Sequence, residues 1–153
     1  KNFYLRRYIG KDTNNGAEYQ ALLIGLLKVR SIVEDFVAQK EGYFCSVSVE
    51  VKGDSHIIIM QQKGAYQCKA ANLKPLYNET KGIKFQIEKI TEAKFSFEHV
   101  YRENNTIADR LANEAMDQRR SWETTENDEI IAKKSATALL YGRKSRIVSK
   151  KGE

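Results

Sequence analysis

The sequence predicts an α/β domain, with a mixed sheet flanked by helices, because strand-like and helix-like segments alternate along the chain. Residues 95–102 alternate between two different faces, which is the period of a strand. Polar capping residues at 103–106 follow, and apolar residues then recur at helical spacing through residue 115. Residues 45–62 show a similar change from a strand pattern to a helix pattern.

The remaining elements follow from the same patterns, taken in chain order. Strands are expected over residues 2–9, 44–51 and 95–102. Helices are expected over residues 14–39, 54–62, 69–78 and 83–93, and from residue 106 onward. Pro75, the single proline, falls inside the third helix, so that helix is expected to start at Leu73 or Lys74 with the proline in its first turn.

Three acidic residues stand at or near the points where helices begin. Glu18 lies in the early turns of the first helix, Asp54 follows the second strand, and Asp109 lies in the first turn of the last helix. Taken singly, each is explained by capping or by the helix dipole, and Asp54 followed by Ser55 makes a good N-cap. Taken together, acids at the carboxyl ends of strands are expected to converge, and clustered carboxylates need a cation such as Mg²⁺.

Three segments, in this order and spacing, resemble the type 1 ribonuclease H family. They read TNNGAEYQAL at residues 13–22, VKGDS at 51–55 and HVYRENNTIADRLANEA at 99–115. The resemblance covers about residues 2–117, and it implies a ribonuclease H-like fold that cleaves the RNA strand of RNA/DNA hybrids. It also implies that Glu18, Asp54 and Asp109 are catalytic ligands of two Mg²⁺ ions, for which Mn²⁺ substitutes.

The same resemblance implies contacts with nucleic acid. Asn14 and Asn15 match the pair that touches the minor groove of a hybrid, where 2′-hydroxyl groups distinguish the RNA strand. Thr13 lies where the family approaches a phosphate. His56 stands where the family commonly has a glutamine, and Arg102 is a further expected contact.

The chain also departs from the family pattern. The family's fourth acid, which bridges both metals on the first strand, has no counterpart here, and residues 1–9 resemble the family's third strand. Asp12 is no substitute, because it lies in the loop before the first helix. We therefore expect an N-terminally incomplete domain, with another polypeptide segment between residues 2–9 and residues 45–51, and poor hydrolysis by this chain alone. His99 falls within a strand and is expected to be structural.

Composition agrees with a globular nucleic-acid-binding protein. The chain has 153 residues, 41% of them hydrophobic, and a net charge of +6, which favours a polyanionic partner. Cys45 and Cys68 have no metal-ligand spacing, and their simple interpretation is two buried thiols in an intracellular, reducing compartment. Mitochondrial, nuclear and cytoplasmic locations stay open. No apolar run approaches the ~20 residues that span a membrane.

Residues 1–120 form the predicted domain, and residues 121–153 are predicted to be a linker and a basic C-terminal tail. The linker is polar and acidic. Cations of the tail that are expected to bind RNA are Lys133, Lys134, Arg143, Lys144 and Arg146. The alternative interpretation of the tail is a solvated charge run.

Two functions of different classes remain open at this stage. The first is a hybrid-specific endoribonuclease. The second is a non-catalytic RNA-binding subunit of a large ribonucleoprotein such as an organellar ribosome. The acids favour the enzyme, whereas the lack of a bridging aspartate and the basic tail favour the subunit.

Overall fold

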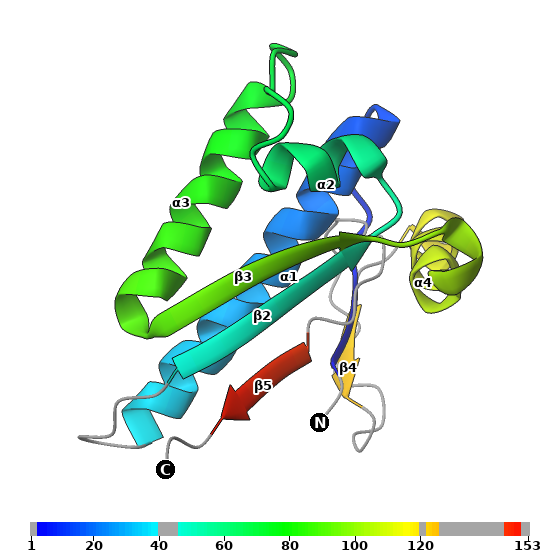
Figure 1. The fold of residues 1–153 in the computed structure, drawn as a ribbon. Coiled ribbons are helices and arrows are strands. Elements are labelled where there is room, and N and C mark those ends of the chain that lie inside the picture. The colour runs from blue at the N-terminus through cyan, green and yellow to red at the C-terminus, as the bar shows by residue number, and fades with distance from the viewer. Residues whose placement is uncertain (1–2, 40–45, 120–121, 126–145, 151–153) are drawn as a thin grey trace.

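The structure is a computed structural model that describes residues 3–39, 46–119, 122–125 and 146–150. Figure 1 shows how the elements are arranged. The strands are β1 (Phe3–Arg6), β2 (Ser46–Gly53), β3 (Glu92–His99), β4 (Trp122–Thr125) and β5 (Arg146–Lys150). The helices are α1 (Asn14–Gln39), α2 (His56–Gln62), α3 (Lys74–Ile90) and α4 (Thr106–Gln118), and a 3₁₀ turn, η1, spans Arg102–Asn104.

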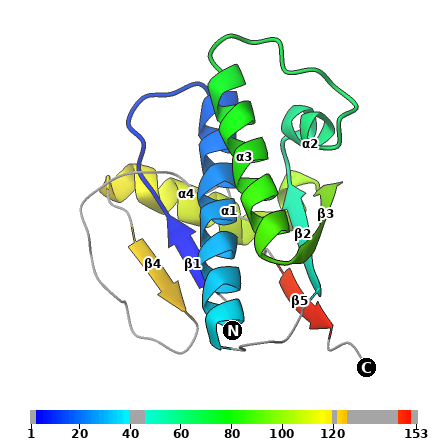
Figure 2. The ribbon, with the colours of Figure 1, turned by 90° about the vertical axis from the view of Figure 1, so that its left-hand side faces the viewer.

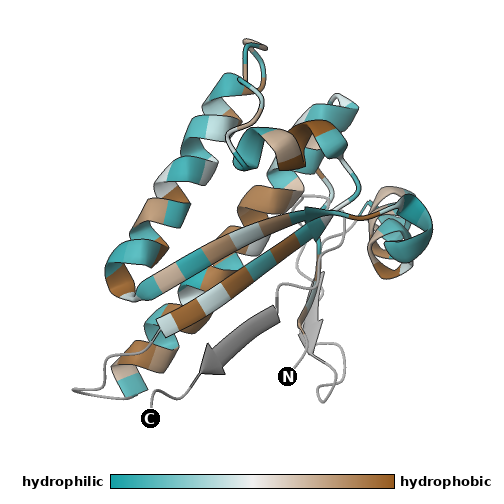
Figure 3. Cartoon of the chain, viewed as in Figure 1, coloured by the Kyte–Doolittle hydropathy of each residue, from teal (hydrophilic) through white to brown (hydrophobic). Residues whose placement is uncertain are grey.

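The strands form two sheets in the described part of the chain. β2 lies between β3, to which it is parallel, and β5, to which it is antiparallel, while β1 pairs with β4 antiparallel. A parallel pair needs a long crossover, and α2 and α3 provide it between β2 and β3. Val47, Val49 and Val51 are buried on one face of β2, and Figure 3 shows the matching alternation of hydrophobic and hydrophilic residues.

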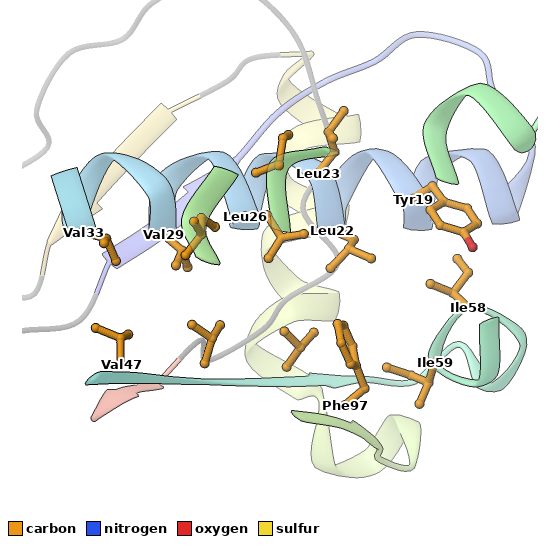
Figure 4. Packing of buried hydrophobic residues seen from close by; sticks show 14 of the residues in the cluster. Tyr19, Leu22, Leu23, Leu26, Val29, Val33, Val47, Ile58, Ile59 and Phe97 are labelled. Atoms are coloured by element: carbon orange, nitrogen blue, oxygen red, sulfur yellow. The ribbon is translucent and has the colours of Figure 1, made fainter. Parts of the chain in front are cut away.

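Helices α1 and α3 pack side by side over β2 and β3, and α4 lies behind them in the rotated view (Figure 2). α1 directs one apolar row toward the valines of β2 (Figure 4). The members of this row are Tyr19, Leu22, Leu26, Val29 and Val33. Burial of each such side chain contributes about 1.5–3 kcal/mol before conformational entropy is subtracted, so this interface stabilises the domain.

One helix replaces the two that were predicted over residues 69–78 and 83–93. α3 runs through Gly82 without interruption because Thr80, Ile83 and Ile87 lie on one helical face, which is buried toward α1. Glycine inside a helix costs about 1 kcal/mol relative to alanine, and the burial of two isoleucines outweighs that cost. Pro75 occupies the first turn, as expected.

The C-terminal residues differ most from expectation. Residues 122–125 and 146–150 were assigned to the linker and the tail, and they form β4 and β5. A separate polypeptide segment was expected beside the first two strands. In the structure the partners of β1 and β2 come from the same chain, and within the described residues these two strands do not pair with each other.

Several element boundaries also move. β1 ends at Arg6 rather than at residue 9, and β2 ends at Gly53 rather than at residue 51. α2 begins at His56 rather than at residue 54, and β3 spans Glu92–His99 rather than residues 95–102. None of the helices in the described ranges has the length and hydropathy needed to cross a bilayer.

Candidate functional site

Glu18 lies in the second turn of α1, and only 8% of its surface is exposed. The start of the helix is held by Thr13, whose hydroxyl oxygen accepts a hydrogen bond from the Gly16 backbone N–H (3.1 Å) and whose carbonyl accepts one from Ala17 (2.9 Å). The hydroxyl that was expected near a phosphate therefore also caps α1. The arrangement fixes the position at which Glu18 enters the core.

Asp12 supports the same helix start and is not one of the three acids Glu18, Asp54 and Asp109. Its carboxylate accepts hydrogen bonds from the Thr13 backbone N–H (2.7 Å) and from Gln20 Nε2 (3.2 Å). A Cβ at residue 16 would overlap this carboxylate, so Gly16 allows the close approach. The negative charge lies at the positive end of the helix dipole.

Asp54 directly follows β2 and is half-buried. The N-cap residue of α2 is Ser55, so the capping interpretation of Asp54 is wrong. The Asp54 backbone oxygen instead accepts a hydrogen bond from His99 Nε2 (3.2 Å), which places the imidazole proton on that nitrogen. The Val100 backbone N–H also donates to the Gly53 carbonyl (2.9 Å), so the ends of β2 and β3 are joined beside Asp54.

Asp109 lies in the first turn of α4, where Asn105 is the N-cap residue. Its Oδ1 atom is 3.2 Å from Nη2 of Arg102, which belongs to η1. The Asp109 side chain is 33% exposed and the Arg102 side chain 69% exposed, so water screens this ion pair and its contribution to stability is small. The guanidinium nevertheless occupies space next to the carboxylate.

The three acids lie at helix starts, as the sequence indicated. However, no three His, Cys, Asp or Glu side chains in the described ranges form a group that could hold a metal ion. Clustered carboxylates at metal-binding distance would repel one another without a cation. The assignment of Glu18, Asp54 and Asp109 as ligands of two metal ions therefore stays a prediction.

The expected nucleic-acid contacts are placed in several elements. Asn14 and Asn15 are the first two residues of α1, where their side chains are exposed and half-buried respectively. His56 is exposed at the start of α2, and Arg102 is exposed in η1. Arg146 opens β5, with its backbone opposite Glu50 of β2. The other four tail residues, Lys133, Lys134, Arg143 and Lys144, lie outside the described residues.

Four rings, which we call the ring row, form a chain of contacts at the carboxyl ends of β2 and β3. The ring centroids of Tyr66 and His56 are 5.9 Å apart, those of His56 and His99 are 5.4 Å apart, and those of His99 and Tyr101 are 5.6 Å apart. Each neighbouring pair is edge-to-face, a favourable arrangement for aromatic rings. The row was not predicted from the sequence, although the spacing of His99 and Tyr101 on one strand face indicated two of its four rings.

Comparison with known proteins places these residues in a family context. The profile of a family described as reverse transcriptase-like matches residues 4–115. A bifunctional protein of Mycobacterium tuberculosis is 36% identical over 112 residues, which are 73% of this chain and 26% of that protein. The ribonuclease HI of Halobacterium salinarum is 31% identical over 109 residues, which are 71% of this chain and 46% of that enzyme. The chain thus spans less than half of the length of these curated relatives.

Two solved structures resemble the fold as well as the sequence. One is the N-terminal RNase H domain of the M. tuberculosis protein, solved as a fusion with maltose-binding protein. It has a TM-score of 0.53 and 32% identity, with 72% of each chain covered. The other is RNase H1 of H. salinarum, with a TM-score of 0.52 and 32% identity, covering 72% of this chain and 70% of that one. The matched residues 4–115 include Thr13, all three acids, His56 and Arg102.

Proposed function

We propose, from the premise that this chain belongs to the ribonuclease H family, that it binds RNA/DNA hybrids. The observation that carries the proposal is the exposure of polar groups at helix starts: Asn14 at the start of α1, His56 at the start of α2 and Arg102 before α4. Amide side chains can reach the minor groove of a hybrid, and a guanidinium suits a phosphate. The net charge of +6 supports a polyanionic partner.

Cleavage of the RNA strand is the reaction that family membership suggests for this site. The three acids do not form a group that could hold a metal ion within the described residues, and Asp109 is engaged by Arg102. A change at a metal site's supporting groups typically costs 10- to 100-fold in affinity or activity. We therefore propose that this chain by itself binds hybrids but cleaves them poorly.

Binding is tested with three duplexes of one sequence: an RNA/DNA hybrid, a DNA duplex and an RNA duplex. Fluorescence anisotropy at fixed salt should give the lowest Kd for the hybrid. The double variant Asn14→Ala/Asn15→Ala should lose this preference. Asn78→Ala, which truncates an exposed asparagine on α3, is the matched control and should keep it. Equal Kd values for the hybrid and the DNA duplex would contradict the proposal.

Cleavage is tested with a hybrid labelled on its RNA strand, in Mg²⁺ or in Mn²⁺. We expect slow product formation, which Asp54→Asn should reduce further. The control is Asp35→Asn, which changes an exposed acid near the C-terminal end of α1. Efficient Mg²⁺-dependent cleavage by this chain, abolished by Asp54→Asn, would show that the acids assemble when substrate is bound and would refute poor cleavage.

A second candidate function is a non-catalytic RNA-binding subunit of a large ribonucleoprotein. The Arg102–Asp109 ion pair favours it, because the guanidinium neutralises a carboxylate that the enzyme would need for its metal. A structured RNA without DNA should then bind at least as tightly as the hybrid and remain uncut. A hybrid preference of tenfold or more would favour the first function.

A further inference from the structure

The ring row is not part of the hydrophobic core. None of its four rings belongs to the buried clusters of the described residues, and Tyr66 and Tyr101 are 45% and 69% exposed. His56 is exposed as well, and only His99 is half-buried. Large rings left in water gain little from the hydrophobic effect. Their arrangement therefore calls for a reason other than the stability of the core.

The row lies next to two of the three acids. His99, in its middle, is bound through Nε2 to the Asp54 backbone oxygen (3.2 Å). Tyr101, at one end, immediately precedes Arg102, which pairs with Asp109. Tyr66, at the other end, follows α2 and contacts only the ring of His56 among the row members. His56, which belongs to the row, and Arg102, which follows Tyr101, are both part of the proposed hybrid-binding site, so the row lies beside that site.

We propose that the ring row binds unpaired nucleobases of a strand that continues beyond the hybrid. Bases inside a duplex are already stacked on each other, so their faces are closed to protein rings. An unpaired strand exposes those faces, and aromatic side chains bind them by stacking. The edge-to-face contacts hold each ring of the row against the next, so the two exposed tyrosines are partly ordered before a ligand arrives.

Charge also fits a nucleic-acid strand at this position. Arg102 is 69% exposed and stands next to Tyr101, so a backbone phosphate and a stacked base can be bound by neighbouring residues. This inference rests on the proposed hybrid binding and specifies the substrate further: a hybrid with a single-stranded extension. Its ligand class is an unpaired oligonucleotide of either sugar type.

The test compares one blunt RNA/DNA hybrid with the same hybrid carrying a six-nucleotide overhang, in separate RNA and DNA versions. We expect the wild-type chain to bind the overhang hybrids more tightly. Tyr66→Ala/Tyr101→Ala should weaken their binding roughly 5- to 150-fold, from the effect of losing a stacked base, and should leave the blunt hybrid within twofold. Phe85→Ala is the control, since Phe85 is 56% exposed on α3 outside the row.

The outcomes separate this inference from the proposed function. Binding of the blunt hybrid with no gain from either overhang overturns the ring-row inference and leaves hybrid binding intact. Weak binding of the blunt hybrid together with tyrosine-dependent binding of a free single strand overturns hybrid binding and supports the row. A loss in the double variant that is equal for blunt and overhang hybrids, or matched by Phe85→Ala, also overturns the inference. Circular dichroism melts confirm that each variant is folded.

Discussion

Nη2 of Arg102 lies 3.2 Å from Oδ1 of Asp109 and connects η1 to the first turn of α4. The pair matters little for stability but changes the charge next to Asp109. It adds little to stability, because both side chains reach water. It also places a positive charge at a carboxylate that the ribonuclease H interpretation assigns to a metal.

Removal of this cation should favour a bound divalent ion. Arg102→Gln should change the free energy of unfolding by less than about 1 kcal/mol, as expected for an exposed pair. It should tighten Mn²⁺ binding roughly two- to tenfold, from the Coulomb repulsion between a divalent ion and a nearby guanidinium in water. Isothermal titration calorimetry with Mn²⁺ alone measures the affinity.

Arg110→Gln is the matched control for that experiment. Arg110 also lies near the start of α4, is 66% exposed and pairs with Glu114 at 3.8 Å. Its replacement removes one positive charge without touching Asp109, so Mn²⁺ affinity should stay within twofold of wild type. A gain of the same size in both variants would mean that net charge, and not the Arg102–Asp109 contact, controls cation binding.

A second ion pair joins β1 to α4 and is stabilising for a different reason. Arg6 is buried, its Nη1 lies 2.7 Å from Glu114 Oε2, and its Nη2 donates to Gln118 Oε1 at 2.6 Å. Burial lowers the pKa of Arg6, and the neighbouring Glu114 carboxylate raises it. Glu114→Gln leaves the buried cation without its counter-charge and should lower the free energy of unfolding by about 1–3 kcal/mol.

Urea unfolding at pH 7 tests the Arg6–Glu114 prediction. Because the Glu114 side chain is 37% exposed, water screens part of the charge, and we expect the lower half of that range. The double variant Arg6→Met/Glu114→Gln removes the cation as well and should recover part of the loss. An unfolding free energy unchanged by Glu114→Gln alone would show that Gln118 satisfies Arg6.

The fold was predictable where one periodic pattern ran through a long segment. α1 spans Asn14–Gln39, the same residues that helical spacing indicated. α3 was not predictable as one helix, because Gly82 and the polar residues before it are a local breaking signal. Only the packing of Thr80, Ile83 and Ile87 toward α1 shows why the helix continues, and that contact joins segments about 50 residues apart.

The positions of the candidate site residues near helix starts were predictable from the sequence, but their contacts were not. Helix starts located Glu18, Asp54 and Asp109 from the sequence alone. Whether Asp54 caps α2 could not be decided from the sequence, and in the structure the N-cap residue is Ser55. The Arg102–Asp109 contact depends on η1, which the strand pattern gave no means to predict. Contacts of this kind arise from tertiary structure and leave no periodic signal.

Alkaline pH should destabilise the domain through Tyr19. Burial raises the pKa of this phenol from 10.0 to about 12, and its hydroxyl donates to the buried Gln61 side chain. Between pH 10 and 12 the unfolded chain releases the phenol proton while the folded chain keeps it. The folded state then binds more protons, so the unfolding free energy falls as pH rises, by at most about 1.4 kcal/mol per pH unit for this group.

Urea unfolding of wild type and Tyr19→Phe at pH 8, 10 and 11 isolates this effect. The variant should be less stable at pH 8, because Gln61 loses its donor, and the gap should narrow above pH 10. Tyr66→Phe changes an exposed tyrosine and is the control. A constant gap across the three pH values would mean that Tyr19 titrates alike in both states.

The basic C-terminal segment should contribute phosphate contacts to RNA binding. Each phosphate that a protein neutralises on a single strand adds about 0.7 to the magnitude of the slope of log affinity against log salt. A variant with glutamine in place of four tail cations should therefore reduce that slope magnitude by up to roughly 3. The four are Lys133, Lys134, Arg143 and Lys144.

Arg146 stays unchanged in that variant, because it opens β5, whose backbone pairs with β2. The control replaces four exposed lysines of the described part with glutamine and so removes the same total charge. Its positions are Lys69, Lys74, Lys81 and Lys94. Anisotropy titrations of single-stranded RNA at several salt concentrations should show a smaller slope for the tail variant than for the control. A slope that falls only in the control variant would place the phosphate contacts on the folded domain, because the charge removed is equal in both variants.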